Sequence, residues 1–235
     1  AEFVRKSVEA LMPYCRLWVP INEPNVFVFS AYLEGVFPPG KQDLRAAYRV
    51  LRNMVLAHAR AYAAIHEIQP DARVGSVIHF RGFEPATWLP TDGWAANIYH
   101  RLFNDLFPRA LRDGVLHAII KKEYIPEAAG TQDFLGINYY ATDTLRFDLF
   151  AAGSLFTQRT YPEDAALSET GFIAHTPQGM VKAVRWGEGF GVPIIITENG
   201  VEDSRDELRP RYMLEHLYAL WQVMNRNGVV EGYFH

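Results

Sequence analysis

Five short apolar runs recur along the chain, each bounded by turn-forming residues. A continuous apolar run of this length is typical of a strand that is buried on both faces of a sheet. Pro20 weakens the first run as a strand, because proline removes a donor from the hydrogen-bond ladder. The expected strands are residues 16–21, 73–80, 133–140, 192–197 and 229–234.

Amphipathic segments lie between these runs. Apolar side chains recur every three or four positions in residues 44–65, which predicts a helix that begins at the N-cap Asp43 and stops before Pro70. Three more helices are expected. One covers residues 95–112, with a break at Pro108 and a cap at Gly114. Another begins at Pro177 with Thr176 as its N-cap, and the last begins at Pro210, runs through Met224 and is closed by Gly228. In the last of these, Tyr212, Leu217 and Trp221 are expected to pack against the sheet.

The order of these elements, strand then helix, predicts a parallel sheet with helices outside it. An open doubly wound sheet and part of a (β/α)₈ barrel both fit this order. In either fold the chemistry lies at the carboxyl ends of the strands. Residues 141–175 have no period and are expected to form a long loop that includes a hairpin, a kind of segment that is usually functional.

Composition excludes several classes of protein. The 235 residues carry 23 Lys and Arg against 27 Asp and Glu, so the net charge of −4 gives no general attraction to nucleic acid or to an anionic membrane. No apolar run reaches the length of a membrane span, and the first residues lack the features of a signal peptide, which favours a cytoplasmic location. The single Cys15 excludes an internal disulfide framework, and the eight histidines show no metal-binding spacing.

Two glutamates stand at the ends of expected strands. Glu23 comes after residues 16–21 and Glu198 after residues 192–197, each beside an asparagine. A carboxylate next to a buried run is costly unless it is solvated, paired or used. Either both point to solvent, or they share a site. Two carboxyl groups across a pocket suit glycoside hydrolysis, in which one protonates the leaving oxygen and the other attacks the anomeric carbon.

Three segments around these residues resemble the signatures of glycoside hydrolase family 1, the β-glucosidase family. Ile21-Asn22-Glu23-Pro24-Asn25 resembles the acid/base motif, Ile195-Ile196-Thr197-Glu198-Asn199-Gly200 the nucleophile motif, and Asp133-Phe134-Leu135-Gly136-Ile137-Asn138-Tyr139-Tyr140 a third signature. Residues 56–61 and 231–234 fit the family as well. Three motifs in the family's order make a specific match, and the resemblance extends over nearly the whole chain.

The resemblance implies a (β/α)₈ TIM barrel and a retaining mechanism that hydrolyses terminal β-linked sugars. Glu23 would be the general acid/base and Glu198 the nucleophile, at the ends of the family's fourth and seventh strands. Asn22 would hydrogen-bond the sugar 2-hydroxyl, Tyr140 would donate to the nucleophile, and Asn138 would line the same subsite. The substrate would be a small-molecule or oligosaccharide β-glycoside, and neither a metal nor an organic cofactor is expected.

The resemblance also implies that residues 1–235 form one partial catalytic barrel, covering roughly strands 4 to 8. The chain begins at Ala1 without a methionine and ends at His235 inside an expected strand. We therefore expect the N-terminal strands and the extreme C-terminus of the domain to lie outside this sequence, and the 235 residues by themselves to be inactive.

Some residues depart from the family's pattern. Asn25 stands where many members have an aromatic residue that stacks on the leaving group, which leaves the leaving-group preference open. Phe83, Trp88 and Trp94 either line that part of the site or pack within a loop. Two other interpretations remain. The chain could be a noncatalytic carbohydrate-binding remnant, but the presence of both glutamates argues against this. It could also be a nucleotide-binding domain, but no glycine-rich phosphate loop follows an expected strand.

Overall fold

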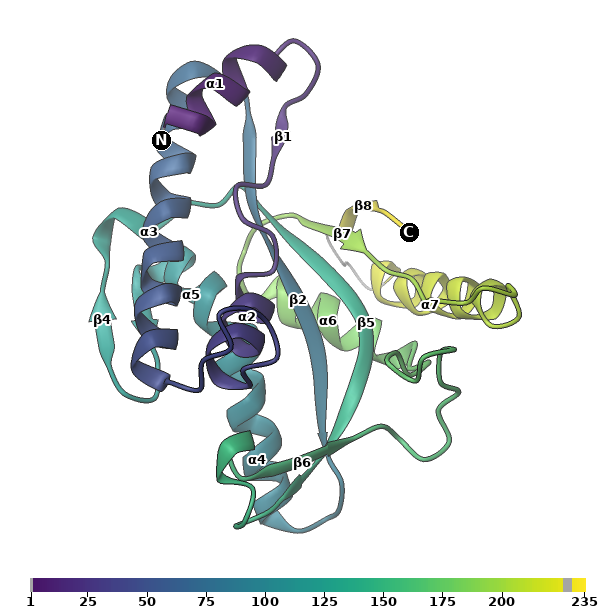
Figure 1. Ribbon diagram of the computed structural model, residues 1–235. Coiled ribbons are helices and arrows are strands. Elements are labelled where there is room, and N and C mark those ends of the chain that lie inside the picture. The colour runs from purple at the N-terminus through teal and green to yellow at the C-terminus, as the bar shows by residue number, and fades with distance from the viewer. Residues whose placement is uncertain (1, 226–229) are drawn as a thin grey trace. The chain divides into compact units, whose positions relative to one another are not determined.

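The computed structural model describes residues 2–225 and 230–235, in which parallel strands alternate with helices (Figure 1). The main sheet has the strand order β1-β2-β5-β7-β8, and β6 pairs with β5 in an antiparallel hairpin. The expected parallel sheet is therefore confirmed. The strands are β1 (Leu17–Trp18), β2 (Arg73–Pro85), β3 (Val115–His117), β4 (Lys122–Tyr124), β5 (Phe134–Phe147), β6 (Thr157–Thr160), β7 (Ile194–Glu198) and β8 (Val230–Tyr233).

The helices connect and cover these strands. The α-helices are α1 (Glu2–Leu11), α2 (Pro24–Val28), α3 (Leu44–Ile68), α4 (Pro90–His100), α5 (Leu106–Asp113), α6 (Gln178–Glu188) and α7 (Arg209–Met224). Two π-helical segments, η1 (Phe29–Leu33) and η2 (Arg101–Asp105), and two short 3₁₀ segments, η3 (Pro126–Ala128) and η4 (Ala152–Ser154), complete the described elements.

The chain divides into two compact units. The first contains the chain up to Ile78 together with Asp105–Gly136, and the second contains His79–Asn104 and Ile137–His235. The strands β2 and β5 each begin in the first unit and continue in the second.

In the first unit, α1 packs on α3 (Figure 1). The core between them is formed by buried residues from α1, α3, the turn after α3 and the start of β2, which are Val8, Ile65, Ala72 and Val74. The predicted N-cap of α3 is confirmed, because the Asp43 carboxylate accepts hydrogen bonds from the main-chain N–H groups of Arg45 at 2.8 Å and Ala46 at 3.0 Å.

His58 lies on the buried face of α3. Its Nε2–H donates to the main-chain oxygen of Thr131 at 2.8 Å, and the side chain is completely buried. Burial lowers the pKa of His58 to about 4, because the charged imidazolium would lose its hydration. The residue is therefore neutral in the folded protein at neutral pH.

This burial makes stability depend on pH, and His58→Gln is expected to reduce that dependence. An unfolded histidine titrates near pH 6.5, so between pH 6.5 and 4 the unfolded chain binds one more proton at this position than the folded chain. Stability is lost as the pH falls through this window, by up to about 1.4 kcal/mol per pH unit for this group. Urea unfolding of the complete protein at several pH values measures the slope. Glutamine keeps a donor for Thr131 but does not titrate.

The matched control is His117→Gln, because His117 is exposed at the end of β3. We expect this variant to keep the slope of the wild-type protein. An unchanged slope in His58→Gln would contradict the assignment of this proton uptake to His58.

In the second unit, α6 and α7 lie beside each other (Figure 1). Gly179 allows the start of α6 to approach β5, because a Cβ at this position would come within 1.9 Å of the Tyr139 hydroxyl oxygen. The core on the side of α7 is formed by Ala141, Ile173, Ala174, Val201 and Tyr212.

The structure corrects several element predictions. The helix expected over residues 95–112 begins at Pro90 and breaks at η2 rather than at Pro108. The break precedes the proline because a proline ring clashes with the carbonyl four residues earlier, here Asn104. The N-cap of α6 is Pro177 and not Thr176. The Thr176 hydroxyl instead accepts a hydrogen bond from the N–H of Thr142 at 2.9 Å.

The expected loop over residues 141–175 is partly strand. β5 continues to Phe147, and β6 forms the expected hairpin with it. The helices α1 and α2 and the β3–β4 hairpin were not predicted. The expected helix end at Gly228 and the first residue of the last strand, Val229, lie outside the described residues.

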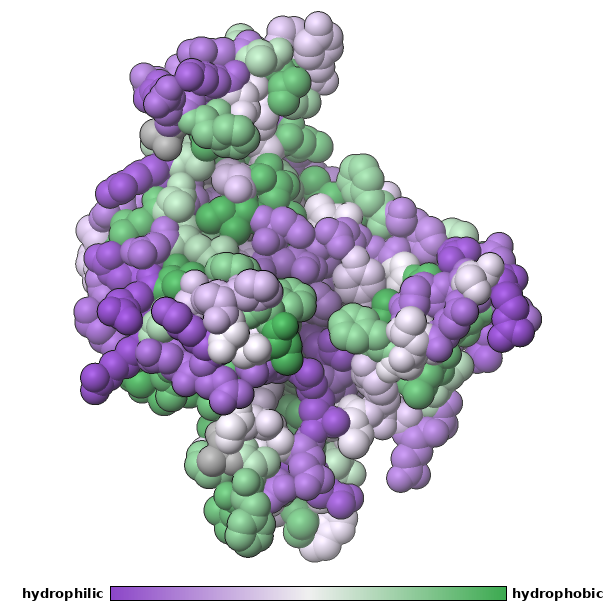
Figure 2. All heavy atoms as spheres, viewed as in Figure 1, coloured by the Kyte–Doolittle hydropathy of each residue, from purple (hydrophilic) through white to green (hydrophobic). Residues whose placement is uncertain are grey.

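Exposed apolar side chains gather around α4 and the segment before β6 in the second unit (Figure 2), among them Leu89, Leu149 and Phe150. Trp88 is 90% exposed, and Trp94 is exposed and packs edge-on against Phe147. Phe83 lies in β2 rather than in a loop, and it packs within the unit against Tyr99 and Phe103. Within residues 2–225 and 230–235, the structure contains no helix with the length and apolar character needed to span a membrane.

Candidate functional site

In the second unit, Glu198 is the last residue of β7, and its side chain is half-buried. The three isoleucines before it are buried, so the strand emerges from the core at the carboxylate. The Tyr140 hydroxyl donates a hydrogen bond to the Glu198 carboxylate. A hydrogen bond to an ionised carboxylate is stronger than one between neutral groups. The structure thus brings together two of the residues that the motifs singled out.

Asn138 lies on the same strand as Tyr140 and is fully buried. Its side-chain oxygen accepts a hydrogen bond from the Thr197 hydroxyl at 2.6 Å. Because Thr197 precedes Glu198, two residues of β5 hold the end of β7 from one side. The chain reaches this arrangement through strand alternation, which places Asn138 and Tyr140 on the same face of β5.

Asn199, directly after Glu198, is buried and held by three partners. Its Nδ2 group donates to the main-chain oxygen of Tyr139 at 2.7 Å and to the hydroxyl of Tyr212 at 3.1 Å. Its Oδ1 atom accepts a hydrogen bond from the Tyr233 hydroxyl at 2.9 Å. The amide is therefore fixed in orientation between β5, α7 and β8.

The buried polar groups around Asn199 are neutral at neutral pH. Burial raises the pKa of Tyr139 to about 12 and also raises the pKa of Tyr212, while burial lowers the pKa of His216 to about 4. These three side chains therefore act through hydrogen bonds and packing rather than through charge.

In the first unit, Asn22 and Glu23 lie between β1 and α2. Asn22 forms a parallel bridge with Val77 of β2, and the Glu23 N–H donates to the Val77 oxygen at 3.0 Å. Pro24 then begins α2. Glu23 thus follows a bridge to β2, whereas the strand expected over residues 16–21 is limited to Leu17–Trp18.

The backbone of Glu23 is strained. Its φ of 46° and ψ of 53° place it in the left-handed region, which costs a residue with a side chain about 1–2 kcal/mol. The following Pro24 disfavours the right-handed helical conformation at Glu23. Strain of this kind persists only where the surrounding structure imposes it, and it is concentrated at functional sites.

The structure therefore brings Glu198, Tyr140 and Asn138 together in the second unit, and Asn22 and Glu23 together in the first. Sequence reasoning missed Asn199, Tyr233 and the polar role of Tyr212, for which it predicted only packing. A buried tyrosine hydroxyl needs a hydrogen-bond partner, so the position of Tyr212 on the inner face of its helix was the available signal.

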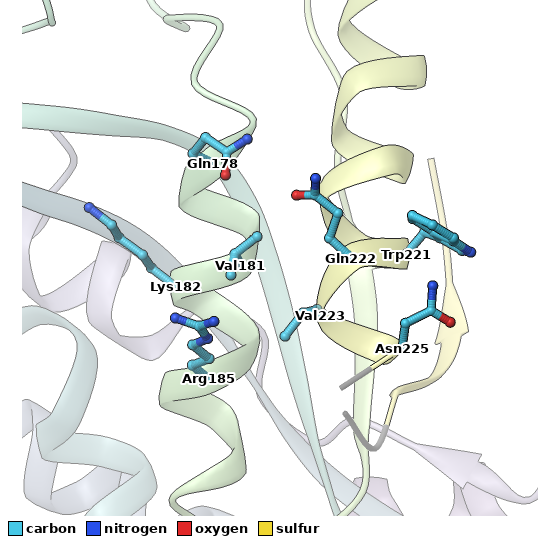
Figure 3. Close-up of a pocket in the computed structure, with 8 residues that line it drawn as sticks. All are labelled: Gln178, Val181, Lys182, Arg185, Trp221, Gln222, Val223 and Asn225. Carbon is cyan, nitrogen blue, oxygen red and sulfur yellow. The ribbon is translucent and has the colours of Figure 1, made fainter. Parts of the chain in front are cut away.

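A separate groove of about 700 Å³ runs between α6 and α7 (Figure 3). The residues that line it are Gln178, Val181, Lys182, Arg185, Trp221, Gln222, Val223 and Asn225. None of the predicted site residues is among them. Trp221 is 56% exposed, so the expectation that it packs against the sheet is wrong.

Comparison with known proteins gives a consistent result. The family model described as Glycosyl hydrolase family 1 matches residues 2–235. Beta-glucosidase A of Thermotoga maritima is 30% identical over all of this chain, which covers 57% of that protein. Beta-galactosidase of Pyrococcus woesei is 28% identical over 93% of this chain, which covers 49% of that protein. The chain therefore spans about half the length of these curated relatives.

A solved structure agrees with this match. The structure of beta-glucosidase from Thermotoga maritima in complex with glucoimidazole superposes on 99% of this chain with a TM-score of 0.86 and 27% identity. This chain covers 57% of that structure. The strands and helices of the present chain are therefore those of part of a (β/α)₈ TIM barrel, as the sequence resemblance implied.

Proposed function

The chain belongs to glycosyl hydrolase family 1, and on that premise we propose that the complete protein is a retaining β-glycosidase. The observation that carries the proposal is the hydrogen bond from Tyr140 to the carboxylate of Glu198 at the end of β7. This hydrogen bond fixes the orientation of the carboxylate that would attack an anomeric carbon. The carboxyl end of a barrel strand is also where such enzymes carry their catalytic groups.

In the first step, the Glu198 carboxylate attacks the anomeric carbon while the Glu23 carboxylic acid protonates the glycosidic oxygen. The bond from the anomeric carbon to the leaving group breaks, the glycosyl ester with Glu198 forms, and the aglycone departs as an alcohol. In the second step, Glu23 takes a proton from water, whose oxygen attacks the same carbon and releases Glu198. Two inversions retain the configuration.

Asn22 and Asn138 complete the proposed sugar site. Asn22 precedes Glu23 and bridges β2, so its position is set by the sheet. We propose that its amide binds the sugar 2-hydroxyl, where a contact that strengthens in the transition state accelerates the reaction. Asn138 is held by Thr197 beside the nucleophile's strand and would line the same subsite.

The proposed substrates are small-molecule or oligosaccharide β-glycosides with a terminal glucose or galactose. The names of the relatives, a beta-glucosidase and a beta-galactosidase, support this class, with β-glucosides as the first choice. Residues 1–235 would form one partial catalytic barrel, which is supported by a family match that runs through both compact units. A noncatalytic remnant is the alternative, and the presence of both glutamates argues against it.

The test uses the complete protein with an activated 2-deoxy-2-fluoro-β-glucoside. The fluorine slows both steps, and the activated leaving group restores the first, so a glycosyl ester accumulates. We expect one sugar per protein by mass spectrometry, located on the peptide that contains Glu198, together with hydrolysis of aryl β-glucosides. A complete protein that hydrolyses no aryl β-glycoside and takes up no label would refute the proposal.

A further inference from the structure

Tyr212 hydrogen-bonds two residues next to the proposed nucleophile: Tyr140, which donates to Glu198, and Asn199, which follows it. It lies in the first turn of α7 and is completely buried. Its hydroxyl donates to the main-chain oxygen of Tyr140 at 2.8 Å and accepts from the side-chain amide of Asn199 at 3.1 Å. One hydroxyl thus joins α7 to β5 and to the residue that follows Glu198.

The first branch of this network reaches the carboxylate through Tyr140. The Tyr140 hydroxyl donates to Glu198, and the Tyr140 main chain is held by Tyr212. A shift of this main chain therefore moves the donor away from the carboxylate. Misplacement by about 1 Å can cost a reaction about 10²-fold.

The second branch reaches Glu198 through the peptide bond to Asn199. Both N–H bonds of the Asn199 amide are used, one on the Tyr139 oxygen and one on Tyr212, and its oxygen accepts from Tyr233. An amide with these partners has one allowed orientation. Loss of the Tyr212 hydroxyl would leave a buried N–H without its acceptor, which is costly.

The Tyr212 ring is itself held in place. His216, one helical turn later, stacks on it with ring centroids 3.9 Å apart and an angle of 26°. The Nδ1–H of His216 donates to the Tyr212 main-chain oxygen at 2.7 Å. Removing only the hydroxyl therefore leaves the ring in its packed position, which allows the hydrogen bonds to be tested separately from the packing.

We propose that Tyr212 is a positioning residue that holds Glu198 for attack, acting through the main chain of Tyr140 and the side chain of Asn199. This inference rests on the proposed function, since it assigns no new reaction. It places part of the catalytic machinery on α7, outside the motifs that carry the family resemblance.

The test compares Tyr212→Phe with Tyr99→Phe in the complete protein. Tyr99 is also a buried tyrosine of the second unit, and its hydroxyl donates to the main-chain oxygen of Ser154 at the same distance of 2.8 Å. Both variants lose one hydroxyl and one donated bond, and Tyr212→Phe also leaves the Asn199 N–H without its acceptor, so we expect Tyr212→Phe to lose more stability than Tyr99→Phe. Only Tyr212→Phe is expected to lower kcat, by about tenfold or more, with KM changed less than about twofold.

The rate at which the fluorinated glucoside labels Glu198 provides a second readout, because it measures the first chemical step alone. We expect it to fall by the same factor as kcat in Tyr212→Phe and to stay unchanged in Tyr99→Phe. If Tyr212→Phe does not fold, Tyr233→Phe removes another partner of Asn199 and is expected to slow labelling several-fold.

Each result separates the two proposals. Wild-type labelling of Glu198 with equal rates in Tyr212→Phe would overturn the positioning role and leave the proposed function standing. Equal losses of kcat in Tyr212→Phe and Tyr99→Phe would also overturn it, because the effect would then be one of general stability. A wild-type protein that neither hydrolyses nor labels would refute the function, and the positioning role with it.

Discussion

In the complete protein, Glu198→Ala is expected to slow hydrolysis of aryl β-glucosides by ~10⁴-fold or more. Alanine removes the group that forms the covalent intermediate, so the first step loses its nucleophile. Initial rates with a nitrophenyl β-glucoside measure the loss. Binding of an unreactive glucose analogue is expected to change little, since the sugar site is otherwise intact.

Azide provides the decisive readout for Glu198→Ala. A small anion can enter the space left by the carboxylate and attack the anomeric carbon, with the aryl oxide as the leaving group. This single displacement inverts the configuration, so the product is the α-glucosyl azide. The control is Glu207→Ala, whose side chain is 69% exposed and which is expected to keep full activity. A Glu198→Ala protein with normal hydrolysis would exclude this residue as the nucleophile.

Glu23→Ala is expected to produce a loss that depends on the leaving group. Substrates with poor leaving groups need the proton that Glu23 supplies, so their hydrolysis should fall by about 10²–10⁴-fold. For dinitrophenyl β-glucoside the first step needs no proton, and kcat/KM should change little. Comparison of kcat/KM across a series of aryl glucosides measures this dependence.

The second step distinguishes Glu23 from Glu198. Without the base, the glycosyl ester should accumulate, and azide should release it as the β-glucosyl azide, because the displacement occurs at an enzyme-bound ester. The control in the same compact unit is Glu9→Ala on α1, where the side chain is exposed. An equal loss for every leaving group would contradict the acid/base role.

The apolar pattern predicted most of the sheet, because an uncharged run between turn residues fits a strand buried on both faces. It failed where polar residues continue a strand. β5 extends beyond Tyr140 through Asp143, whose carboxylate pairs with Arg81 at 2.7 Å, and Arg81 lies 62 residues away along the chain. Periodicity describes only local sequence, so it does not reveal such a partner.

Because periodicity describes only local sequence, it also failed to predict the helix α1. Of its apolar residues, Val8 is buried while Phe3 is 82% exposed, and the core that holds the helix includes Ile65 and Val74. The stabilisation of this helix comes from residues that are distant in sequence, and its own pattern of apolar positions therefore gave little indication of it.

The candidate site was predictable to the extent that its residues stand in motifs. Glu198 and Tyr140 belong to separate motifs, and the structure joins them. Tyr212 stands in no motif, and Tyr233 lies in residues 231–234, which fit the family without indicating a polar role for the tyrosine. A tyrosine on a helix or strand is usually a packing residue. Their roles became visible only through hydrogen bonds to Asn199, which join α7 and β8 to the end of β7.

The left-handed backbone of Glu23 has a consequence for protein engineering. Glycine adopts this conformation without the steric cost that a side chain pays, so Glu23→Gly relieves strain at the position proposed for the acid/base. A library selected only for heat resistance would therefore enrich a substitution that removes the proposed proton donor. Selection for thermostability in this protein should be combined with a turnover screen that uses a poor leaving group.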